Sequence, residues 1–535
     1  MRTRDGVRLD ADVYRPDAAG PFPVLLMRQP YGREIASTVV YAHPTWYAAQ
    51  GYIVVIQDVR GRGTSAGKFE LFANEVADGE DTVNWAAQLP GSDGQVGMYG
   101  FSYQGMTQLY AAQAQPAALK AIAPAMVGYH PYADWAYENG ALCLQIGLSW
   151  AIQLAAETAR LAGDEARYQQ LYAAARQLPL NDPVPARPEV LAAIAPESFF
   201  HDWLDHPTED DYWQSLTPQL DSVDLPMLHI GGWFDPYLRG NLRLYREMAS
   251  RSPQPQQLWV GPWGHIPWGR KVGAVDFGSK AISPMDQVQI RWFEHFLKGK
   301  LTDLLDQPPV CWFEMGSNHW RRFDAWPQPE TQRYFLHSSG LASIRTDDGK
   351  LSQAPLSDGD DVLIHDPWRP APARGGHAAI PAGSFERTEI DSRSDVLTYT
   401  TGPLKASLEV AGEPAVELIC QTDAASYDLC AVLSVVHPDG TVYNLTQGYR
   451  RCDRDAIQPI SLTLQPTCFR LNLGQALRLS LSAACFPAYP VNPGTGNPAK
   501  SARLIEAQII TLTIQHGQSA GSKVLLPVLP SAAIG

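Results

Sequence analysis

The stretch Asp93-Gly-Gln-Val-Gly-Met-Tyr-Gly-Phe-Ser-Tyr-Gln-Gly105 decides the expected fold of this 535-residue chain. Its apolar run passes through Gly100-Phe-Ser102 directly into the helix-like segment Met106–Ala114. A serine on a sharp strand-to-helix turn needs small neighbours, because the backbone crowds itself there and glycine tolerates the close approach. The pattern therefore predicts an exposed Ser102 hydroxyl at the carboxyl end of a strand. The usual elbow is G-x-S-x-G, whereas here the second glycine, Gly105, comes one residue later.

Short apolar runs on both sides of this stretch indicate parallel strands that alternate with helices. Runs of this kind, bounded by Pro, Gly or Asp, are typical of strands buried in a βαβ arrangement. The runs are Val24–Met27, Tyr52–Ile56, Val96–Tyr99, Leu119–Ala123, Pro226–Gly231 and Gln257–Gly261. Residues 126–220 lie between the fourth and fifth runs and are rich in Ala, Leu and Gln without strand-like alternation. They predict a helical insertion.

The composition after Pro308 shifts to short alternating runs of Thr, Val, Leu and Ser. Strands at short spacing with turn signals are typical of an antiparallel β-sandwich of the jelly-roll kind. Within this region, the Pro- and Gly-rich stretch Pro367–Gly376 is expected to be a long solvated loop.

Charge and cysteine content exclude several classes of function. The chain has 42 Lys and Arg against 56 Asp and Glu, a net charge of −14, which repels nucleic acid and anionic membrane surfaces. No apolar stretch is long enough for a membrane span or a secretory signal, so we expect a cytoplasmic protein. The seven scattered cysteines favour reduced, buried thiols over a disulfide framework or a zinc site. The oligomeric state stays open, a homo-oligomer included.

Two later strand ends supply partners for the serine. A serine hydroxyl is a poor nucleophile until a base removes its proton, and that base needs an orienting acid. In chain order the acid and then the histidine follow the serine, and Asp235 and His265 stand just after the fifth and sixth apolar runs. Asp58 comes too early for this order and Asp134 lies in the helical insertion. We therefore predict that Ser102, Asp235 and His265 form a catalytic triad.

These motifs resemble the CocE/NonD hydrolases. The elbow with its shifted glycine, Gly231-Gly-Trp-Phe-Asp235 and Gly261-Pro-Trp-Gly-His265 carry the resemblance. Further matching stretches are Arg4–Leu9, Asp58–Gly67, Phe293–Gly299, Met315–Trp320, His437–Gly440 and Asn492–Gly496. The resemblance spans essentially the whole chain and is specific to the family, though not to one substrate.

The resemblance implies an α/β fold class: an α/β-hydrolase domain with an inserted helical cap, plus a C-terminal β-sandwich (jelly roll). This agrees with the composition of the segments. The expected boundaries are 1–125 for the first part of the α/β-hydrolase domain, 126–220 for the cap, 221–307 for its second part and 308–535 for the jelly roll.

Five aromatic residues complete the predicted site. The backbone N–H of Tyr103 is an oxyanion donor by the geometry of the elbow, and the resemblance implies that Tyr31, in the dipeptide Pro30-Tyr31, supplies the second donor. Trp135 and Trp150 in the cap, and Tyr237 after the aspartate, match aromatic positions of the family's acyl pocket. For Tyr31 and the two tryptophans, a purely structural place in the core or at a rim is the alternative.

The expected activity is that of a serine esterase or amidase that forms an acyl-enzyme with an apolar or aromatic acyl group and needs no metal or organic cofactor. The alternatives are an acyltransferase or cyclase that uses the same residues, an X-Pro dipeptidyl-peptidase, and more remotely a non-catalytic carbohydrate-binding protein. Tyr237 and Leu238 stand where amino acid ester hydrolases of the family carry acids, which disfavours α-amino acid esters. The dipeptidases have an additional N-terminal domain, which disfavours that activity.

Two further patterns give little support for a nucleotide site or a calcium site. The segment Gly61–Gly67 has the spacing G-x-G-x-x-x-G, which does not match the dinucleotide fingerprint. The acidic stretches Glu209–Asp211 and Asp358–Asp361 lack the alternating ligands of a calcium loop. We expect solvated loops at both acidic stretches and no metal site.

Overall fold

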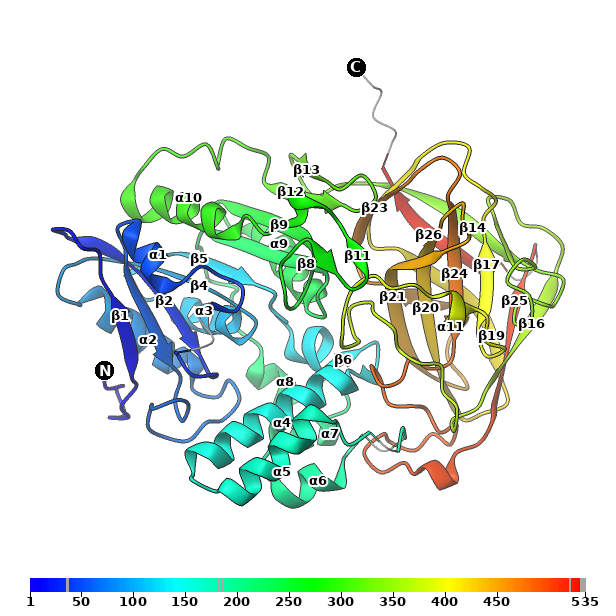
Figure 1. Ribbon diagram of the computed structural model, residues 1–535, viewed down its shortest axis with the longest axis horizontal. Coiled ribbons are helices and arrows are strands. Elements are labelled where there is room, and N and C mark those ends of the chain that lie inside the picture. The colour runs from blue at the N-terminus through cyan, green and yellow to red at the C-terminus, as the bar shows by residue number, and fades with distance from the viewer. Residues whose placement is uncertain (35–37, 181, 185, 519–520, 530–535) are drawn as a thin grey trace.

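The computed structural model describes residues 1–34, 38–180, 182–184, 186–518 and 521–529 (Figure 1). Its N-terminal half is built on a nine-stranded sheet of order β1-β3-β2-β4-β5-β8-β9-β12-β13. The strands are β1 (Ala11–Tyr14), β2 (Phe22–Gln29), β3 (Ile53–Asp58), β4 (Ser92–Phe101), β5 (Leu119–Ala125), β8 (Met227–Phe234), β9 (Gln256–Gly264), β12 (Val310–Glu314) and β13 (His319–Phe323). All neighbours from β3 to β12 run parallel, and β1 and β13 add antiparallel edges. The carboxyl ends of the parallel strands therefore share one edge.

Helices cover both faces of this sheet, so its central strands are apolar throughout. In β2, Val24 and Leu26 pack in one core cluster, and Leu25 and Met27 pack in another on the opposite face. The helices on the Val24 side are α2 (Glu75–Ala87), α3 (Tyr103–Gln113) and α9 (Leu238–Arg251), and those on the Leu25 side are α1 (Pro44–Ala49) and α10 (Met285–Lys298). A short hairpin and a 3₁₀ turn precede α10: β10 (Lys271–Val272), β11 (Val275–Asp276) and η3 (Ser279–Ala281).

A helical insertion separates β5 from β8 and lies below the sheet in Figure 1. It comprises η2 (Pro131–Ala136), β6 (Tyr137–Glu138), β7 (Ala141–Leu142), α4 (Leu144–Leu161), α5 (Glu165–Arg176), α6 (Glu189–Ile194), α7 (Phe199–Asp205) and α8 (Asp211–Leu216). In α4, the buried Leu144, Leu148, Ile152 and Ala155 recur at helical spacing and form one apolar face. That face packs on the buried Trp203 of α7 and neighbouring cap residues.

The C-terminal part is β-rich and nearly all its strands pair antiparallel. Its larger strands are β14 (Glu330–His337), β16 (Gly359–His365), β18 (Leu408–Gly412), β19 (Ala415–Thr422), β20 (Ser426–Val436), β21 (Val442–Asp453), β23 (Thr467–Leu471), β24 (Ala476–Ser482), β25 (Ile510–His516) and β26 (Lys523–Val528). Shorter elements are β15 (Lys350–Ser352), α11 (Thr388–Asp391), β17 (Leu397–Thr400), β22 (Ile460–Thr463) and η4 (Leu504–Glu506). The fold class predicted from the sequence is confirmed: an α/β-hydrolase domain with helices inserted in it and a β-rich C-terminal domain.

The strands β12 and β13 differ from the prediction. They follow residue 308, where we expected the C-terminal sandwich to start, yet β12 pairs in parallel with β9 through Val310↔Leu258 and Trp312↔Val260. The reason is burial: every residue of β12 is buried, as suits an inner strand covered on both faces rather than a half-exposed sandwich strand.

All seven cysteines are buried and free. Within the described ranges, no helix combines the length and the apolar character needed to cross a bilayer.

Candidate active site

Ser102 sits on a strained turn between β4 and α3. Its φ and ψ are 61° and −128°, a conformation that is costly for a residue with a side chain and that concentrates at functional sites. The Ser102 backbone N–H donates to the Ala125 carbonyl of β5 at 2.9 Å. A Cβ on Gly105 would lie 2.4 Å from Val127 Cγ1 and 2.8 Å from the Ala125 oxygen. The shifted glycine therefore lets α3 approach β5 while the strained turn carries the serine.

Asp235 and His265 meet at the ends of the adjacent strands β8 and β9. His265 Nδ1 lies 2.8 Å from Asp235 Oδ1. The Asp235 side chain is fully buried, whereas 27% of the His265 side chain is exposed. The Tyr237 ring meets the imidazole edge-on, with 5.0 Å between the centroids. The acid is thus enclosed while the imidazole faces open space.

The two competing acids are engaged elsewhere. Asp58 forms an ion pair with Arg33 at 2.6 Å, and Asp134 pairs with Arg243 of α9 at 3.1 Å. Neither acid contacts His265 in the described structure.

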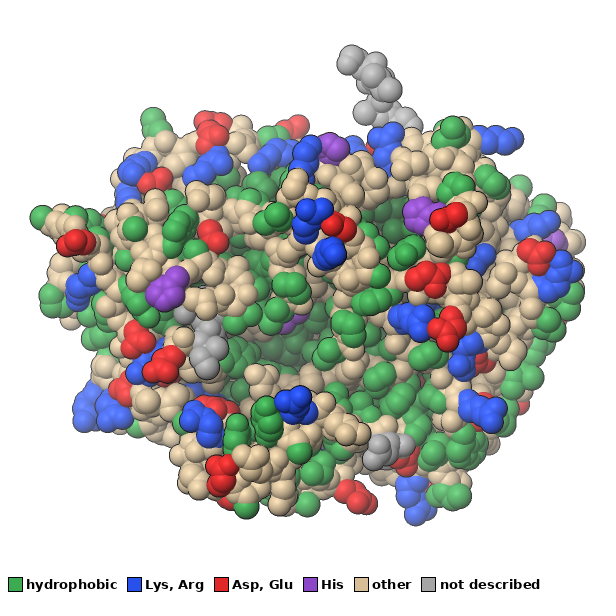
Figure 2. Space-filling model, in the orientation of Figure 1, with side chains coloured by type: hydrophobic (Ala, Val, Ile, Leu, Met, Phe, Trp, Pro, Cys, Tyr) green, Lys and Arg blue, Asp and Glu red, His purple; other side chains and the backbone are tan. Residues whose placement is uncertain are grey.

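A cavity of about 910 Å³ opens over these residues. Figure 2 shows the hollow, with mostly hydrophobic side chains on its walls. Six of the predicted site residues line it: Tyr31, Ser102, Trp135, Trp150, Tyr237 and His265. Asp235 lies behind His265, and Tyr103 lies beneath the elbow outside the cavity. The sequence-predicted residues are therefore brought to one place.

Comparison with known proteins assigns the family. Residues 5–267 match the model of the X-Pro dipeptidyl-peptidase (S15) family, and residues 303–523 match the model of the X-Pro dipeptidyl-peptidase C-terminal non-catalytic domain. The chain is 32% identical to the cocaine esterase of a Rhodococcus species, over 98% of this chain and 97% of that protein. The chain belongs to the CocE/NonD family of serine hydrolases. It is a serine hydrolase that acts on esters or amides.

Two solved structures share the fold of this hydrolase. An aminopeptidase from a marine sediment archaeon, Thaumarchaeota archaeon, superposes with a TM-score of 0.83 at 24% identity, covering 99% of this chain and 95% of the other. An α-amino acid ester hydrolase superposes with a TM-score of 0.79 at 24% identity, covering 98% and 95%.

Tyr31 lies just after β2 and lines the cavity. Its hydroxyl group lies beside the Ser102 and Trp150 side chains. Burial raises the pKa of Tyr31 to about 12, and the neighbouring Trp150 and Ser102 offset part of that rise. The Tyr31 backbone N–H is fixed by Gln29 Oε1 at 3.0 Å. Near neutral pH the phenol is therefore protonated and able to donate a hydrogen bond.

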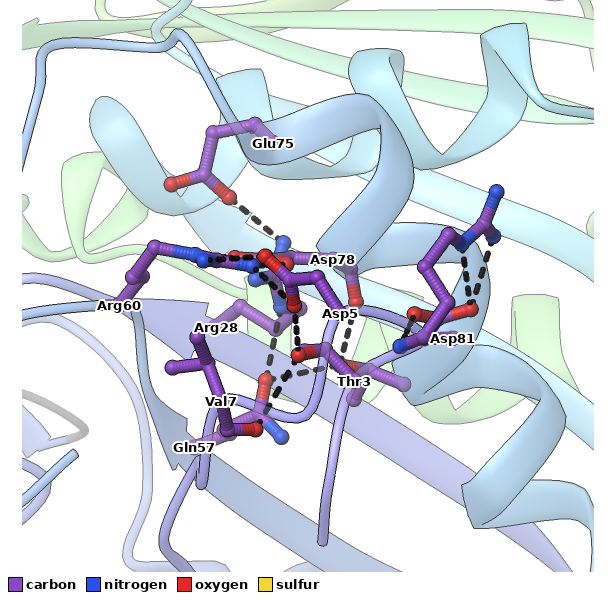
Figure 3. Close-up of polar contacts among 11 residues, drawn as sticks. Thr3, Asp5, Val7, Arg28, Gln57, Arg60, Glu75, Asp78 and Asp81 are labelled. Atoms are coloured by element: carbon purple, nitrogen blue, oxygen red, sulfur yellow. Dashed lines mark hydrogen bonds and ion pairs between the residues drawn. The ribbon is translucent and has the colours of Figure 1, made fainter. Parts of the chain in front are cut away.

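The Tyr103 side chain is anchored beneath the elbow. Its hydroxyl donates to Glu75 Oε1 at 2.8 Å, and the other Glu75 oxygen accepts from Arg28 Nη1 at 2.6 Å. Arg28 Nε in turn donates to Gln57 Oε1 at 2.8 Å. Figure 3 shows Arg28, Gln57 and Glu75 in this buried arrangement. Charged hydrogen bonds of this kind fix their partners, so they hold the first turn of α3, where the Tyr103 N–H lies.

The predicted aromatic residues form one connected wall. The ring centroids of Trp135 and Tyr237 are 4.5 Å apart, and those of Trp135 and Trp150 are 5.3 Å apart. Trp135 is buried in the core cluster that joins the cap to one face of the sheet, and Trp150 is partly buried against that cluster. Each tryptophan therefore packs against this core and also lines the cavity, while its role in substrate binding stays a prediction.

The C-terminal domain also lines the cavity, which the sequence reasoning missed. His377 and Ala379–Ala382 face it. They follow the stretch Pro367–Gly376, which we expected to be solvated but in which Ala371, Gly375 and Gly376 are buried. Trp368, Arg369 and Pro372 of the same stretch are exposed, so the loop is solvated in part, while its buried end leads directly into His377.

His377 forms a second histidine–carboxylate pair across the domains. Its Nε2 lies 2.8 Å from Glu138 Oε2 of the insertion. Glu138 also pairs with Arg239 of α9 at 2.9 Å and accepts from the Tyr489 hydroxyl at 2.6 Å and the Tyr449 N–H at 3.1 Å. No spacing in the sequence links these residues; the only local signal is an acid in the tight hairpin between β6 and β7.

Gln465 of the C-terminal domain contacts the loop that carries Asp235. Its Nε2 donates to the Asp235 backbone carbonyl at 2.6 Å. Gln465 is itself almost completely buried. The β-rich domain therefore contributes to the position of the acid as well as to the cavity wall.

Proposed function

We propose that Ser102 is the nucleophile of this hydrolase, with His265 as general base and Asp235 as the acid that orients it. The observation that carries the proposal is the 2.8 Å contact between His265 Nδ1 and Asp235 Oδ1, at the edge of the cavity that Ser102 and His265 both line. Engagement of Nδ1 fixes the tautomer that leaves Nε2 for the serine proton.

Acylation and deacylation then follow from these groups. The Ser102 oxygen bonds to the substrate carbonyl carbon while its proton moves to His265 Nε2. The tetrahedral intermediate collapses, the bond to the leaving group breaks, and His265 returns the proton to that group. Water repeats the sequence on the acyl-enzyme and releases the free acid with the serine proton restored.

The oxyanion of each intermediate is assigned to two donors, the Tyr31 hydroxyl and the Tyr103 backbone N–H. Donors fixed before the reaction stabilise developing charge without reorganisation. The raised pKa of Tyr31 and the anchored Tyr103 side chain support this assignment.

The aromatic wall favours an apolar or aromatic acyl group. Trp135, Trp150 and Tyr237 present large apolar surfaces with few rotatable bonds. Ile146 and Ile380 add aliphatic surface from the insertion and the C-terminal domain. A substrate moiety that buries against these residues gains most from leaving water.

Covalent labelling tests the nucleophile. We expect a fluorophosphonate probe to modify Ser102 in the folded protein, and the Ser102→Ala variant to lose both labelling and turnover of an activated aryl ester. Ser149 lines the same cavity, so Ser149→Ala is the matched control and should keep both. An adduct on another residue with Ser102 unmodified would refute the assignment.

Product analysis with added amine or alcohol separates hydrolysis from acyl transfer, since hydrolysis releases free acid only.

A further inference from the structure

A second cavity, of about 610 Å³, lies between the loop after β3 and the insertion. Its walls come from residues 61–73 and from α4, α7 and α8. Among the described residues, none lines both this cavity and the catalytic one. Trp150 and Phe199, whose ring centroids are 4.9 Å apart, separate the two, because the first lines the catalytic cavity and the second lines this one.

Arg62 lines this second cavity as a buried cation that forms no ion pair with any described carboxylate. Glu157 of α4 acts on it only at longer range and is itself paired with Arg160 at 2.7 Å. Arg62 is only 2% exposed. Its Nη1 donates to the Leu154 carbonyl at 3.0 Å and to Thr158 Oγ1 at 3.1 Å, both neutral acceptors. Its buried Nε has no hydrogen-bond partner within the described chain. The guanidinium stacks over the Phe69 ring at 3.9 Å.

Arg60, two residues earlier, shows what a neutralised arginine looks like in the same loop. It pairs with Asp5 and Asp78, both at 2.7 Å, as Figure 3 shows. In the described ranges, Arg62 forms no such ion pair. Buried charges in proteins are normally paired, because an uncompensated buried charge is destabilising. Burial lowers the pKa of Arg62 to about 10, which still leaves it charged near neutral pH.

The other charged groups of this cavity limit what can bind. Lys68 is paired with Glu70 at 2.8 Å, and Glu197 forms an ion pair with Arg167. Asp202 is an exposed residue at the rim, and partial desolvation of its carboxylate raises its pKa. A single negative charge beside Arg62 is therefore favoured, while a second one near Asp202 is repelled.

The remaining walls are mostly apolar, although Thr158, Ser198 and Tyr212 add hydroxyl groups. They include the aliphatic side chains of α4 and the loop, together with two aromatic rings: Leu71, Ala151, Leu154, Ala155, Phe69 and Phe199. We propose that this cavity binds a small monocarboxylate with an apolar body, its carboxylate on Arg62 and its body along α4. A guanidinium fork matches a carboxylate in geometry and charge.

Calorimetric titration of the wild-type protein with 3-phenylpropionate tests this proposal, and it does not depend on the assigned nucleophile. We expect saturable binding at one site outside the catalytic cavity, at least tenfold weaker binding in Arg62→Gln, and no comparable binding of the neutral 3-phenylpropanamide. Lys68→Gln removes the other cation of the cavity wall and should leave the affinity within twofold.

A second variant keeps the test decisive if Arg62→Gln does not fold. Ala155→Phe fills the cavity while Arg62 stays in place, and we expect it to abolish the same binding event. Unchanged affinity in either folded variant, equal affinity for the amide, or loss of affinity in Lys68→Gln alone would overturn the proposal.

Discussion

Two histidine–carboxylate pairs face one cavity, and they differ in how completely the acid is satisfied. Asp235–His265 and Glu138–His377 both have a 2.8 Å contact. Asp235 Oδ2 has no hydrogen-bond partner in the described structure, whereas Glu138 has four partners from two other parts of the chain. In the first pair the His265 side chain is partly exposed, whereas in the second pair both side chains are buried.

The pKa values of the two acids move in opposite directions for this reason. Burial raises the pKa of Asp235, and His265 offsets only part of that rise. Burial also acts to raise the pKa of Glu138, but Arg239 and His377 together outweigh it and hold the pKa well below its usual range. A carboxylate with one exposed histidine suits proton transfer, while one surrounded by donors suits a fixed joint between domains.

Asp235→Asn is expected to give the largest loss of activity among the variants of the two pairs. An amide here leaves the geometry intact but favours the wrong histidine tautomer, so we expect kcat to fall by about 10⁴-fold. Steady-state turnover of an aryl ester measures it. The matched substitution in the other pair, Glu138→Gln, should lower kcat/KM by less than about tenfold if that pair is structural. Equal losses would mean that the two pairs do not differ in role.

Glu138→Gln should instead reduce stability. It leaves the partly buried Arg239 charge without its partner, and loss of one partner of a fully buried ion pair typically costs about 3–5 kcal/mol in the free energy of unfolding, so we expect a loss at or below the low end of that range. Urea denaturation measures the loss. Glu413→Gln, which removes an exposed partner of Arg246, is the control and should cost less than about 1 kcal/mol.

The same variant predicts a pH dependence. Because the pKa of Glu138 is lowered by folding, its contribution is fully present above the unfolded value of about 4.3 and is lost as the pH falls toward the folded value. The stability gap between wild type and Glu138→Gln should therefore be constant near neutral pH and shrink below about pH 4. If the difference in unfolding free energy between wild type and Glu138→Gln grew as the pH fell, the assigned role of the Glu138 ion pairs would be wrong.

Tyr31→Phe tests whether the Tyr31 hydroxyl acts as an oxyanion donor beside the Asp235–His265 pair. Loss of one oxyanion donor typically costs about 10²-fold in kcat, with little change in stability. Tyr237 lines the same cavity, so Tyr237→Phe serves as the control and should change kcat by less than about threefold. If Tyr31→Phe behaves like this control, the oxyanion role belongs to another group.

Gln465→Ala is the smallest expected effect and tests whether the two regions communicate. It removes the 2.6 Å hydrogen bond to the Asp235 carbonyl, worth about 1 kcal/mol, so we expect about a fivefold loss in kcat. Gln458, which bonds Cys420 within the C-terminal domain, supplies the control variant. A larger loss in Gln458→Ala would trace the effect to general destabilisation.

Local chain constraints explain why the contact between Asp235 and His265 could be predicted. The elbow, Asp235 and His265 each follow a short apolar run, and parallel strands bring their carboxyl ends to one edge. The strand positions follow from buried apolar runs in the same way. The sequence alone therefore determined the fold class and the neighbourhood of Ser102, Asp235 and His265.

The tertiary structure decided which charged groups pair and which sheet β12 joins, and no local sequence pattern indicates either. Glu138, Arg239 and His377 come from three distant segments, and Arg62 differs from Arg60 only in which carboxylates the fold brings near. The same holds for β12, whose parallel pairing with β9 places it in the hydrolase sheet, where all its residues are buried. Spacing along a chain predicts which groups follow strands, but the pairing of buried charges depends on which surfaces the packed domains bring into contact.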